Sequence, residues 1–397
     1  MEEDAQALQT LFDIAAATIR TNDASWLRPS NLSLLGTRVV LAANAAAENP
    51  QLLESCVVEI DSLDTAGPAQ HRLTLLSRRP ADAQSALQGP VTHLQPLWDQ
   101  QMEVMVYAID GSLGIVQLGG TSELGPPLHL GGDVTGLSTH PQTGRVISGG
   151  SDGQAHVLAF GDHQMGATPD IVCSKNVGKT VTSVRWQPGG DHIASCTTIA
   201  GHFQWQRGVR CGAAPPRSAA VLDLRSDSVA AKVKLELTLN LTPGGPSSTI
   251  LHSHDYLHGD INGGGAADTV VLGYEGGRMQ LLDLRKMAAR ATVWDPDMLE
   301  AKHVTCLPAN FNSGAGGGGG GGGAAAARPH WTCQGPQGAS LWSLAAQGGG
   351  GAPQHCRALA AGAALDGGVA LLPRGGGGVG AQLLGVSPAG RLVALRI

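Results

Sequence analysis

The sequence repeats one short pattern at a nearly constant interval, and this repeat restricts the possible folds more than any other feature. Residues 91–94 (VTHL), 134–137 (VTGL) and 181–184 (VTSV) begin similar segments, which start 43 and 47 residues apart. In the first two segments a short apolar run is followed by Asp-Gly, at 110–111 and 152–153. Because Asp-Gly accepts the positive φ angles of a tight turn, each segment predicts two antiparallel strands joined by a hairpin.

An interval of about 40–45 residues is typical of the blade of a WD40 β-propeller. Weaker copies of the pattern lie at 38–60, 269–285, 304–344 and 382–395, and they bring the total to seven units. We therefore predict an all-β fold in which residues 25–397 form one seven-bladed WD40 β-propeller. Closing the ring removes long free sheet edges, and we expect residues near 26–41 to pair with 383–397 for this purpose.

Several segments lie outside the repeat. Residues 1–24 are predicted to form an N-terminal helical extension, because apolar residues recur at helical spacing within 3–20. These residues are Ala7, Leu8, Leu11, Ile14, Ala15 and Ile19. Residues 312–328 are mostly Gly and Ala and predict a flexible loop. Shorter loop insertions are expected at 208–219 and 241–249, which are rich in Gly, Pro and Ser.

Charge and composition argue against several classes of partner. The formal net charge is −6, and the 26 Lys and Arg residues form no basic stripe, so we expect no direct binding to nucleic acid. The acidic N-terminus (MEED) differs from secretory and transit peptides. No run of about 18 apolar residues occurs, so no membrane span is expected. The seven cysteines include no CxxC pair, which is typical of reduced thiols in a cytosolic or nuclear protein.

Two motifs resemble sites of catalysis or nucleotide binding. Residues 149–153 (GGSDG) have the letters of the hydrolase nucleophile elbow, which needs a strand-to-helix turn, whereas a strand is expected here. We therefore assign Ser151 to a hairpin turn. Residues 178–180 (GKT) resemble the end of a phosphate-binding loop, but Cys173 occupies the position of the required earlier glycine and a strand is expected to follow. The sequence therefore predicts no nucleotide site here.

Residues 252–260 (HSHDYLHGD) form the one tight cluster of metal-type ligands in the sequence. Imidazoles with an orienting carboxylate could hold zinc, or two metal ions in a hydrolase. No second cluster of His and Asp completes such a site, and the segment lies where a repeat needs its outer strand and loop. We therefore expect no catalytic, cofactor-binding or metal-ligating residues, no cofactor, and no small-molecule substrate.

Residues 222–225 and 282–285 share the sequence LDLR, and each is expected to end a blade. The pattern is similar to the W-D-x-R ending of WD40 proteins, with Leu in place of Trp. In a structural role, the Asp accepts hydrogen bonds and the Arg covers the blade edge. In a functional role, such endings dock propellers onto the adaptors of cullin-type ubiquitin ligases.

Several short segments also occur in an order that is similar to that of one known family. These segments are 19–20, 25–29, 55–60, 91–118, 134–137 with 151–153, 251–252 leading to 282–285, 331–333 with 340–342, 371–373, and 384–397. In this order they resemble the forty-three-kilodalton type of nucleoporin, a WD40 propeller of the Y-shaped outer-ring complex of the nuclear pore. The chain departs from the pattern where Trp-Asp pairs are replaced by Leu-Asp or lost, and where the Gly/Ala loop interrupts the sixth unit.

The resemblance implies a non-catalytic scaffold subunit that contributes to nuclear pore assembly and to transport of protein and mRNA. It implies other nucleoporins of the Y-shaped complex as partners, in its short-arm region, and a location in the nucleus, at the nuclear pore complex of the nuclear envelope. The alternative from another class is a WD40 substrate receptor of a cullin-type ubiquitin ligase, suggested by the LDLR endings. An enzyme is supported only by the histidine segment.

Overall fold

The computed structural model consists of β-strands joined by turns, and its described residues contain no helix. The structure describes residues 9–13, 27–35, 38–45, 55–60, 71–77, 91–97, 104–109, 111–118, 123–124, 128–140, 142–160, 169–188, 192–199, 217–225, 229–235, 251–257, 268–295, 297–298, 301, 303–307, 329–344, 353–361, 369–373, 381–386 and 391–396.

Over these residues the strands form seven antiparallel sheets, which follow the order of the repeat. The first sheet holds β2 (Leu27–Leu35), β3 (Arg38–Ala45), β4 (Ser55–Ile60) and β5 (His71–Ser77), and the second holds β6 (Val91–Leu97), β7 (Val104–Ile109), β8 (Ser112–Gln117), β9 (Glu123–Leu124) and β10 (Leu128–His129). The third holds β11 (Val134–Thr139), β12 (Arg145–Gly150), β13 (Gln154–Ala159) and β14 (Asp170–Asn176), and the fourth holds β15 (Thr180–Trp186), β16 (Ile193–Ile199), β17 (Arg217–Asp223) and β18 (Val229–Leu235).

The remaining sheets complete the series. The fifth sheet holds β19 (Leu251–Tyr256), β20 (Thr269–Tyr274), β21 (Arg278–Asp283) and β22 (Ala288–Trp294), and the sixth holds β23 (His303–Cys306), β24 (His330–Gly335), β25 (Gly338–Leu344) and β26 (Pro353–Ala361). The last sheet holds β27 (Val369–Pro373), β28 (Ala381–Val386) and β29 (Arg391–Arg396), together with β1 (Gln9–Asp13) from the other end of the chain.

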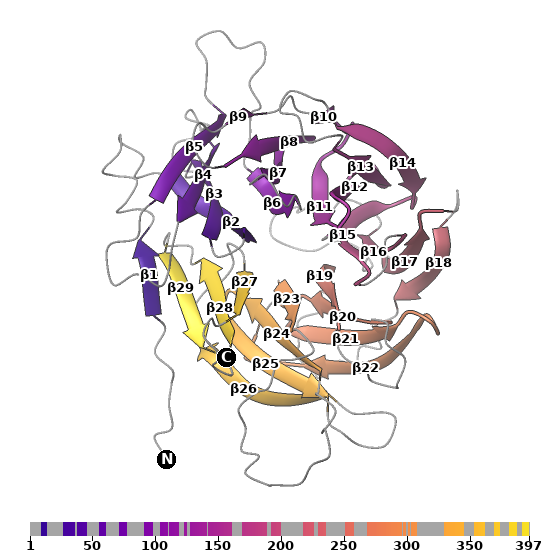
Figure 1. The fold of residues 1–397 in the computed structure, drawn as a ribbon. Helices are drawn as coiled ribbons and strands as arrows, with labels where there is room; N and C mark the ends of the chain where they lie inside the picture. The colour runs from indigo at the N-terminus through magenta and orange to yellow at the C-terminus, as the bar shows by residue number, and fades with distance from the viewer. Residues whose placement is uncertain are drawn as a thin grey trace, which may run out of the picture.

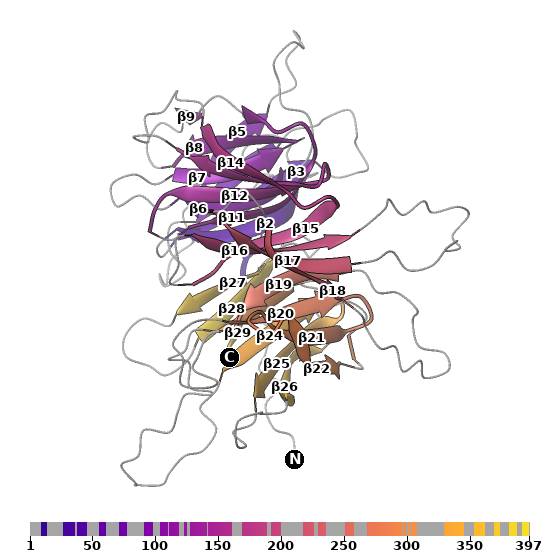
Figure 2. The same cartoon turned by 90° about the vertical axis from the view of Figure 1, so that its right-hand side faces the viewer.

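The sheets are arranged in a ring, which Figure 1 shows along its axis and Figure 2 shows from the side. The first strand of each sheet lies innermost, and these strands contact one another in the order β2, β6, β11, β15, β19, β23, β27 and back to β2. The other strands of each sheet lie progressively farther from the axis. The all-β propeller predicted from the repeat is therefore confirmed.

Strand β1 provides the closure of the ring. It pairs antiparallel with β29, with Gln9 opposite Ala394 and Asp13 opposite Arg391, so the last sheet contains both ends of the chain. The helix predicted within 3–20 is therefore wrong at residues 9–13, and the rest of residues 1–24 lies outside the described part. The closing strand predicted near 26–41 is also wrong, because those residues form β2 and β3 of the first sheet.

The physical reason for this difference is the free edge of β29. A helix would satisfy only its own backbone groups, whereas a strand at residues 9–13 also bonds to the backbone groups that β29 would otherwise leave without protein partners. Helical spacing of apolar residues is a local signal, and pairing across the ring overrides it.

The third strand of the fourth sheet also differs from the prediction. We expected it at 202–205, which lies outside the described residues, and we expected a loop at 208–219. The structure places the strand at β17, paired with both β16 and β18. The predicted loop therefore ends before Arg217, and the repeat is longer here because the connection between its second and third strands is longer.

A threonine near the start of three inner strands lies at an irregularity of the pairing. In two of these strands it joins neighbouring sheets, whereas the Thr182 hydroxyl bonds to Thr197 of its own sheet. The pairing register shifts at Thr92, Thr135 and Thr182, so each occupies a β-bulge. The Thr92 hydroxyl donates to the carbonyl of Ala108 in its own sheet and to the carbonyl of Val134 in the next, both at 3.4 Å. Thr135 likewise donates to a carbonyl of its own sheet and to that of Val181 in the next. The bulge therefore turns one side chain into a bridge between sheets.

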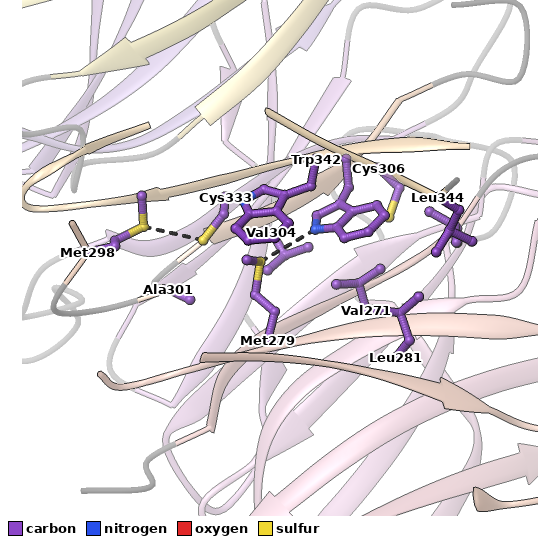
Figure 3. Close-up of a cluster of buried hydrophobic side chains, with 12 residues drawn as sticks. Val271, Met279, Leu281, Met298, Ala301, Val304, Cys306, Cys333, Trp342 and Leu344 are labelled. Atoms are coloured by element: carbon purple, nitrogen blue, oxygen red, sulfur yellow. Dashed lines mark hydrogen bonds between the residues drawn. The ribbon is translucent and has the colours of Figure 1, made fainter. Parts of the chain in front are cut away.

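The core lies between neighbouring sheets, and Figure 3 shows the part between the fifth and sixth. Trp331 is fully buried there, and its indole N–H contacts the Met279 sulfur at 3.4 Å. It stacks on Trp342, with ring centroids 6.4 Å apart. On the same cluster, the Cys333 thiol lies 3.3 Å from the Met298 sulfur. Similar clusters of buried apolar side chains join the second sheet to the third, the third to the fourth and the fourth to the fifth.

The closure predicts unequal tolerance of two deletions. Deleting residues 1–14 should lower the melting temperature by more than about 5 °C, because β29 loses its partner strand. Deleting the glycine tract at 316–323 should lower it by less than about 2 °C, because loop-closure entropy changes slowly with loop length. Differential scanning calorimetry checks both, and equal effects would contradict closure by β1.

The packing predicts a large difference between two tryptophans. Trp331→Ala should lower the free energy of unfolding by about 3–5 kcal/mol, because it leaves a cavity between two sheets. Trp294→Ala is the control, since Trp294 is 55% exposed on the outer strand β22, and it should cost less than about 1 kcal/mol. Urea denaturation followed by circular dichroism gives both values. Similar losses for the two variants would show that the seam, meaning the interface between two neighbouring sheets, is not packed as described.

Candidate functional site

Ser151 lies in the hairpin turn between β12 and β13, as predicted. Its hydroxyl accepts the backbone N–H of Asp133 at 2.9 Å, and the Asp152 carboxylate accepts that of Gln154 at 3.0 Å. Gly153 has a φ of 80°, which the turn requires, and strand β13 follows. The serine therefore fixes a turn, and the strand-to-helix geometry of a nucleophile elbow is not formed here.

The GKT segment at 178–180 leads into a strand, as predicted. Gly178 has a φ of 74° and turns the chain from β14 into β15, so a strand follows where a phosphate-binding loop needs a helix. The Thr180 hydroxyl donates to the carbonyl of Ser151 at 3.2 Å, which ties this turn to the preceding hairpin. The segment therefore serves the seam between the third and fourth sheets.

The histidine segment lies elsewhere than predicted. We expected an outer strand and loop, but residues 251–256 form β19, the innermost strand of the fifth sheet. The reason is that the chain crosses from the outer edge of one sheet to the axis of the next, so the first strand after a crossing is innermost. His258 and Asp260 lie outside the described residues. Within the described part, no three His, Cys, Asp or Glu side chains are grouped to hold a metal ion.

His254 forms a buried pair with a serine of the neighbouring sheet, which the sequence did not reveal. Its Nε2 lies 2.8 Å from the Ser195 hydroxyl, and the two residues are 1% and 2% exposed. Burial and, to a smaller extent, the nearby Arg185 charge lower the pKa of His254 from 6.5 to about 3. Although Ser and His are paired as in some hydrolases, no substrate reaches groups this deeply buried, so the pair joins β16 to β19.

Arg185 and Asp255 form a second cross-sheet network near the axis. The guanidinium Nε of Arg185 lies 3.8 Å from the Asp255 carboxylate, and the other carboxylate oxygen accepts the backbone N–H of Cys306 at 2.8 Å. Asp255 therefore connects three successive inner strands, β15, β19 and β23. Burial, followed by the charge of Arg185, lowers the pKa of His93 on β6 to about 4. The sequence signal for this network was limited to Arg185, a charged residue that stands between Val184 and Trp186 in an expected strand.

The first LDLR segment ends the third strand of its sheet, β17, and the outer strand β18 follows. This corrects the prediction that the motif ends the blade. The Asp223 carboxylate accepts Nε and Nη2 of Arg225 at 3.0 and 2.9 Å, and also the Arg225 backbone N–H at 3.0 Å. These hydrogen bonds lower the pKa of Asp223 to about 2. The side chain of Arg225 is nevertheless 64% exposed.

The second LDLR segment ends β21, with β22 following, but its ion pair differs. The Asp283 carboxylate accepts the backbone N–H groups of Arg285 and Lys286 at 3.0 and 3.1 Å and so caps the turn. Arg285 pairs instead with Asp268, at 3.2 Å, and its side chain is 57% exposed. The side-chain amide of Gln187, from the fourth sheet, donates to the same Asp268 carboxylate at 3.4 Å. The second motif is therefore connected across the seam to the sheet that carries the first.

Two solved structures are similar to this chain over most of its length. A chain in the crystal structure of a mitotic checkpoint complex has a TM-score of 0.54 and 12% identity, and the match covers 99% of this chain and 91% of that one. Sqt1 of Saccharomyces cerevisiae has a TM-score of 0.52 and 11% identity, with 94% and 96% covered. No family model and no curated protein matches the sequence. At this identity the similarity shows the fold, which is that of the WD40 β-propellers.

Among the described residues, no helix has the length and apolar character needed to cross a membrane.

The His254 pair predicts a loss of stability in acid. Its pKa is about 3 in the folded chain and near 6.5 when unfolded, so protons bind the unfolded state first. The contribution of neutral His254 to the free energy of unfolding is complete above about pH 6.5, and about 2 kcal/mol of it is lost by pH 5. Urea denaturation at pH 7.5 and pH 5 should show a smaller difference for His254→Gln than for the unmodified chain. An unchanged difference would mean that His254 does not contribute.

Proposed function

We propose that this chain is a non-catalytic scaffold whose propeller surface binds other proteins. The observation that carries this proposal is that side chains of the types found in catalytic sites make structural contacts within the fold. Ser151 fixes a turn, His254 joins two sheets, and Asp255 connects three inner strands. A rigid, closed ring offers a preformed surface, so binding orders little additional chain. The similarity to WD40 propellers supports the same role.

We propose further that the partners are nucleoporins of the Y-shaped outer-ring complex, at the nuclear pore. The support for this finer proposal is the order of the sequence segments that resemble the nucleoporin family. They run from the entry segment at 25–29 to the closing segment at 384–397. With a net charge of −6, the surface is suited to protein and not to nucleic acid.

A tagged copy in cells tests the proposed location and partners. We expect rim staining of the nuclear envelope and recovery of other outer-ring nucleoporins in a pull-down. Diffuse staining together with stable recovery of cullin adaptors would instead favour the substrate-receptor alternative. Recovery of no stable protein partner at all would contradict the scaffold role.

A further inference from the structure

The outermost strand of the fifth sheet, β22, has an edge to which no strand of the described part is paired (Figure 1). The N–H of Asp295, directly after β22, donates to the carbonyl of Gly277 at 2.9 Å. One residue farther into the sheet, Trp294 lies opposite Arg278. Because the backbone groups of an antiparallel strand point alternately to its two sides, the N–H and C=O groups of Trp294 and Thr292 point away from β21. They face the outside of the ring, where a further strand could pair with them.

Trp294 gives this edge a large apolar side chain. It is 55% exposed, and the other large hydrophobic residues exposed in the described part are Ile171 and Val172 of the outer strand β14. Thr292 is also exposed, and it lies on the same face of the sheet as Trp294 because side chains alternate along a strand. An added strand binds through backbone hydrogen bonds, and an aromatic side chain beside them provides an anchor. The edge of β22 offers both.

The edge is positively charged, although the chain as a whole has a net charge of −6. Residues 286–294 contain Lys286 and Arg290 and no Asp or Glu. Arg290 lies at a β-bulge and donates to the Thr269 hydroxyl at 3.5 Å. No carboxylate of the described residues forms an ion pair with the side chain of Lys286 or Arg290. Both charges are therefore available to a partner.

These charges distinguish between the possible occupants of the edge. Two copies of β22 paired with each other would bring the cations of both strands together, and like charges on an edge oppose such pairing. A strand that carries Asp or Glu is attracted by the same charges. Two cations are too few for a nucleic-acid site, whose affinity depends on neutralising many phosphates.

We propose that the outer edge of β22 binds an extended acidic segment of a partner protein, which adds to the fifth sheet as a further strand. Its backbone bonds to that of Thr292 and Trp294, and one of its apolar side chains packs on the indole. Its carboxylates lie near Lys286 and Arg290. This inference rests on the proposed function, since it names the surface and the chemistry through which the scaffold binds.

The test uses the full chain and a fluorescein-labelled peptide, EVEVEVE, with binding followed by fluorescence anisotropy. Trp294→Ala should weaken binding by at least about tenfold, because it removes the aromatic anchor. Thr292→Pro removes an outward N–H that β21 does not use, and it should weaken binding by at least about fivefold. Thr292→Ser keeps this N–H and should change binding by less than about twofold. Lys286→Glu with Arg290→Glu should weaken binding by at least about tenfold at low salt.

Val172→Ala is the matched control. Val172 is 53% exposed on the outer strand of another sheet, so its truncation should change binding by less than about twofold if β22 is the site. A KVKVKVK peptide should bind the unmodified chain at least about tenfold more weakly than EVEVEVE, because its charges are repelled. Melting temperatures of all variants show whether each one is folded.

Four results would overturn the proposal. They are no binding of EVEVEVE to the unmodified chain, unchanged binding in folded Trp294→Ala or Thr292→Pro, an equal loss in Val172→Ala, and equal binding of the two peptides. Light scattering that shows a dimer of the unmodified chain, dissociated by Thr292→Pro, would assign the edge to a second copy and would also overturn it.

A pull-down from cells separates this inference from the proposed function. If Trp294→Ala and Thr292→Pro retain every stable partner of the unmodified chain, the docking edge is wrong but the scaffold role stands. If the unmodified chain retains no stable protein partner, the scaffold role itself is wrong. Loss of a partner from these variants, but not from Val172→Ala, supports both.

Discussion

Contact between neighbouring sheets is the constraint on which the rest of this structure depends. No sheet can bury its two faces alone, and Trp331, Trp342 and Met279 show that the core is built from side chains of adjacent sheets. A row of such sheets leaves two apolar faces uncovered unless its ends meet. The ring must therefore close. The pairing of β1 with β29, two strands far apart in the sequence, closes it.

Polar groups hold these seams in register, where apolar packing alone would allow sliding. Thr92 and Thr135 donate to the next sheet, His254 pairs with Ser195, and Asp255 accepts a backbone N–H from β23. Each bond satisfies a group that would otherwise be costly to bury. Among the described residues, His254 and Asp255 of the histidine segment thereby join neighbouring sheets of the ring.

Charged side chains have different surroundings near the axis of the ring and at its surface. Arg185 lies on the inner strand β15 and is paired with Asp255, and its charge adds to the larger effect of burial in keeping His93 and His254 neutral. Arg225 and Arg285 lie on an outer face, where carboxylates position them but leave them exposed.

The sequence by itself determined the repeat, the Asp-Gly hairpin at 152–153 and the strand after Gly178, because turn chemistry and strand periodicity are local properties. Only the tertiary structure decided that residues 9–13 form a strand, since their partner β29 is at the other end of the chain and their helical spacing gives no sign of it. It also decided that His254 lies on an inner strand opposite Ser195, because the order of strands from axis to edge depends on how sheets stack. Local sequence specifies elements, whereas contacts between distant segments specify which face each element buries.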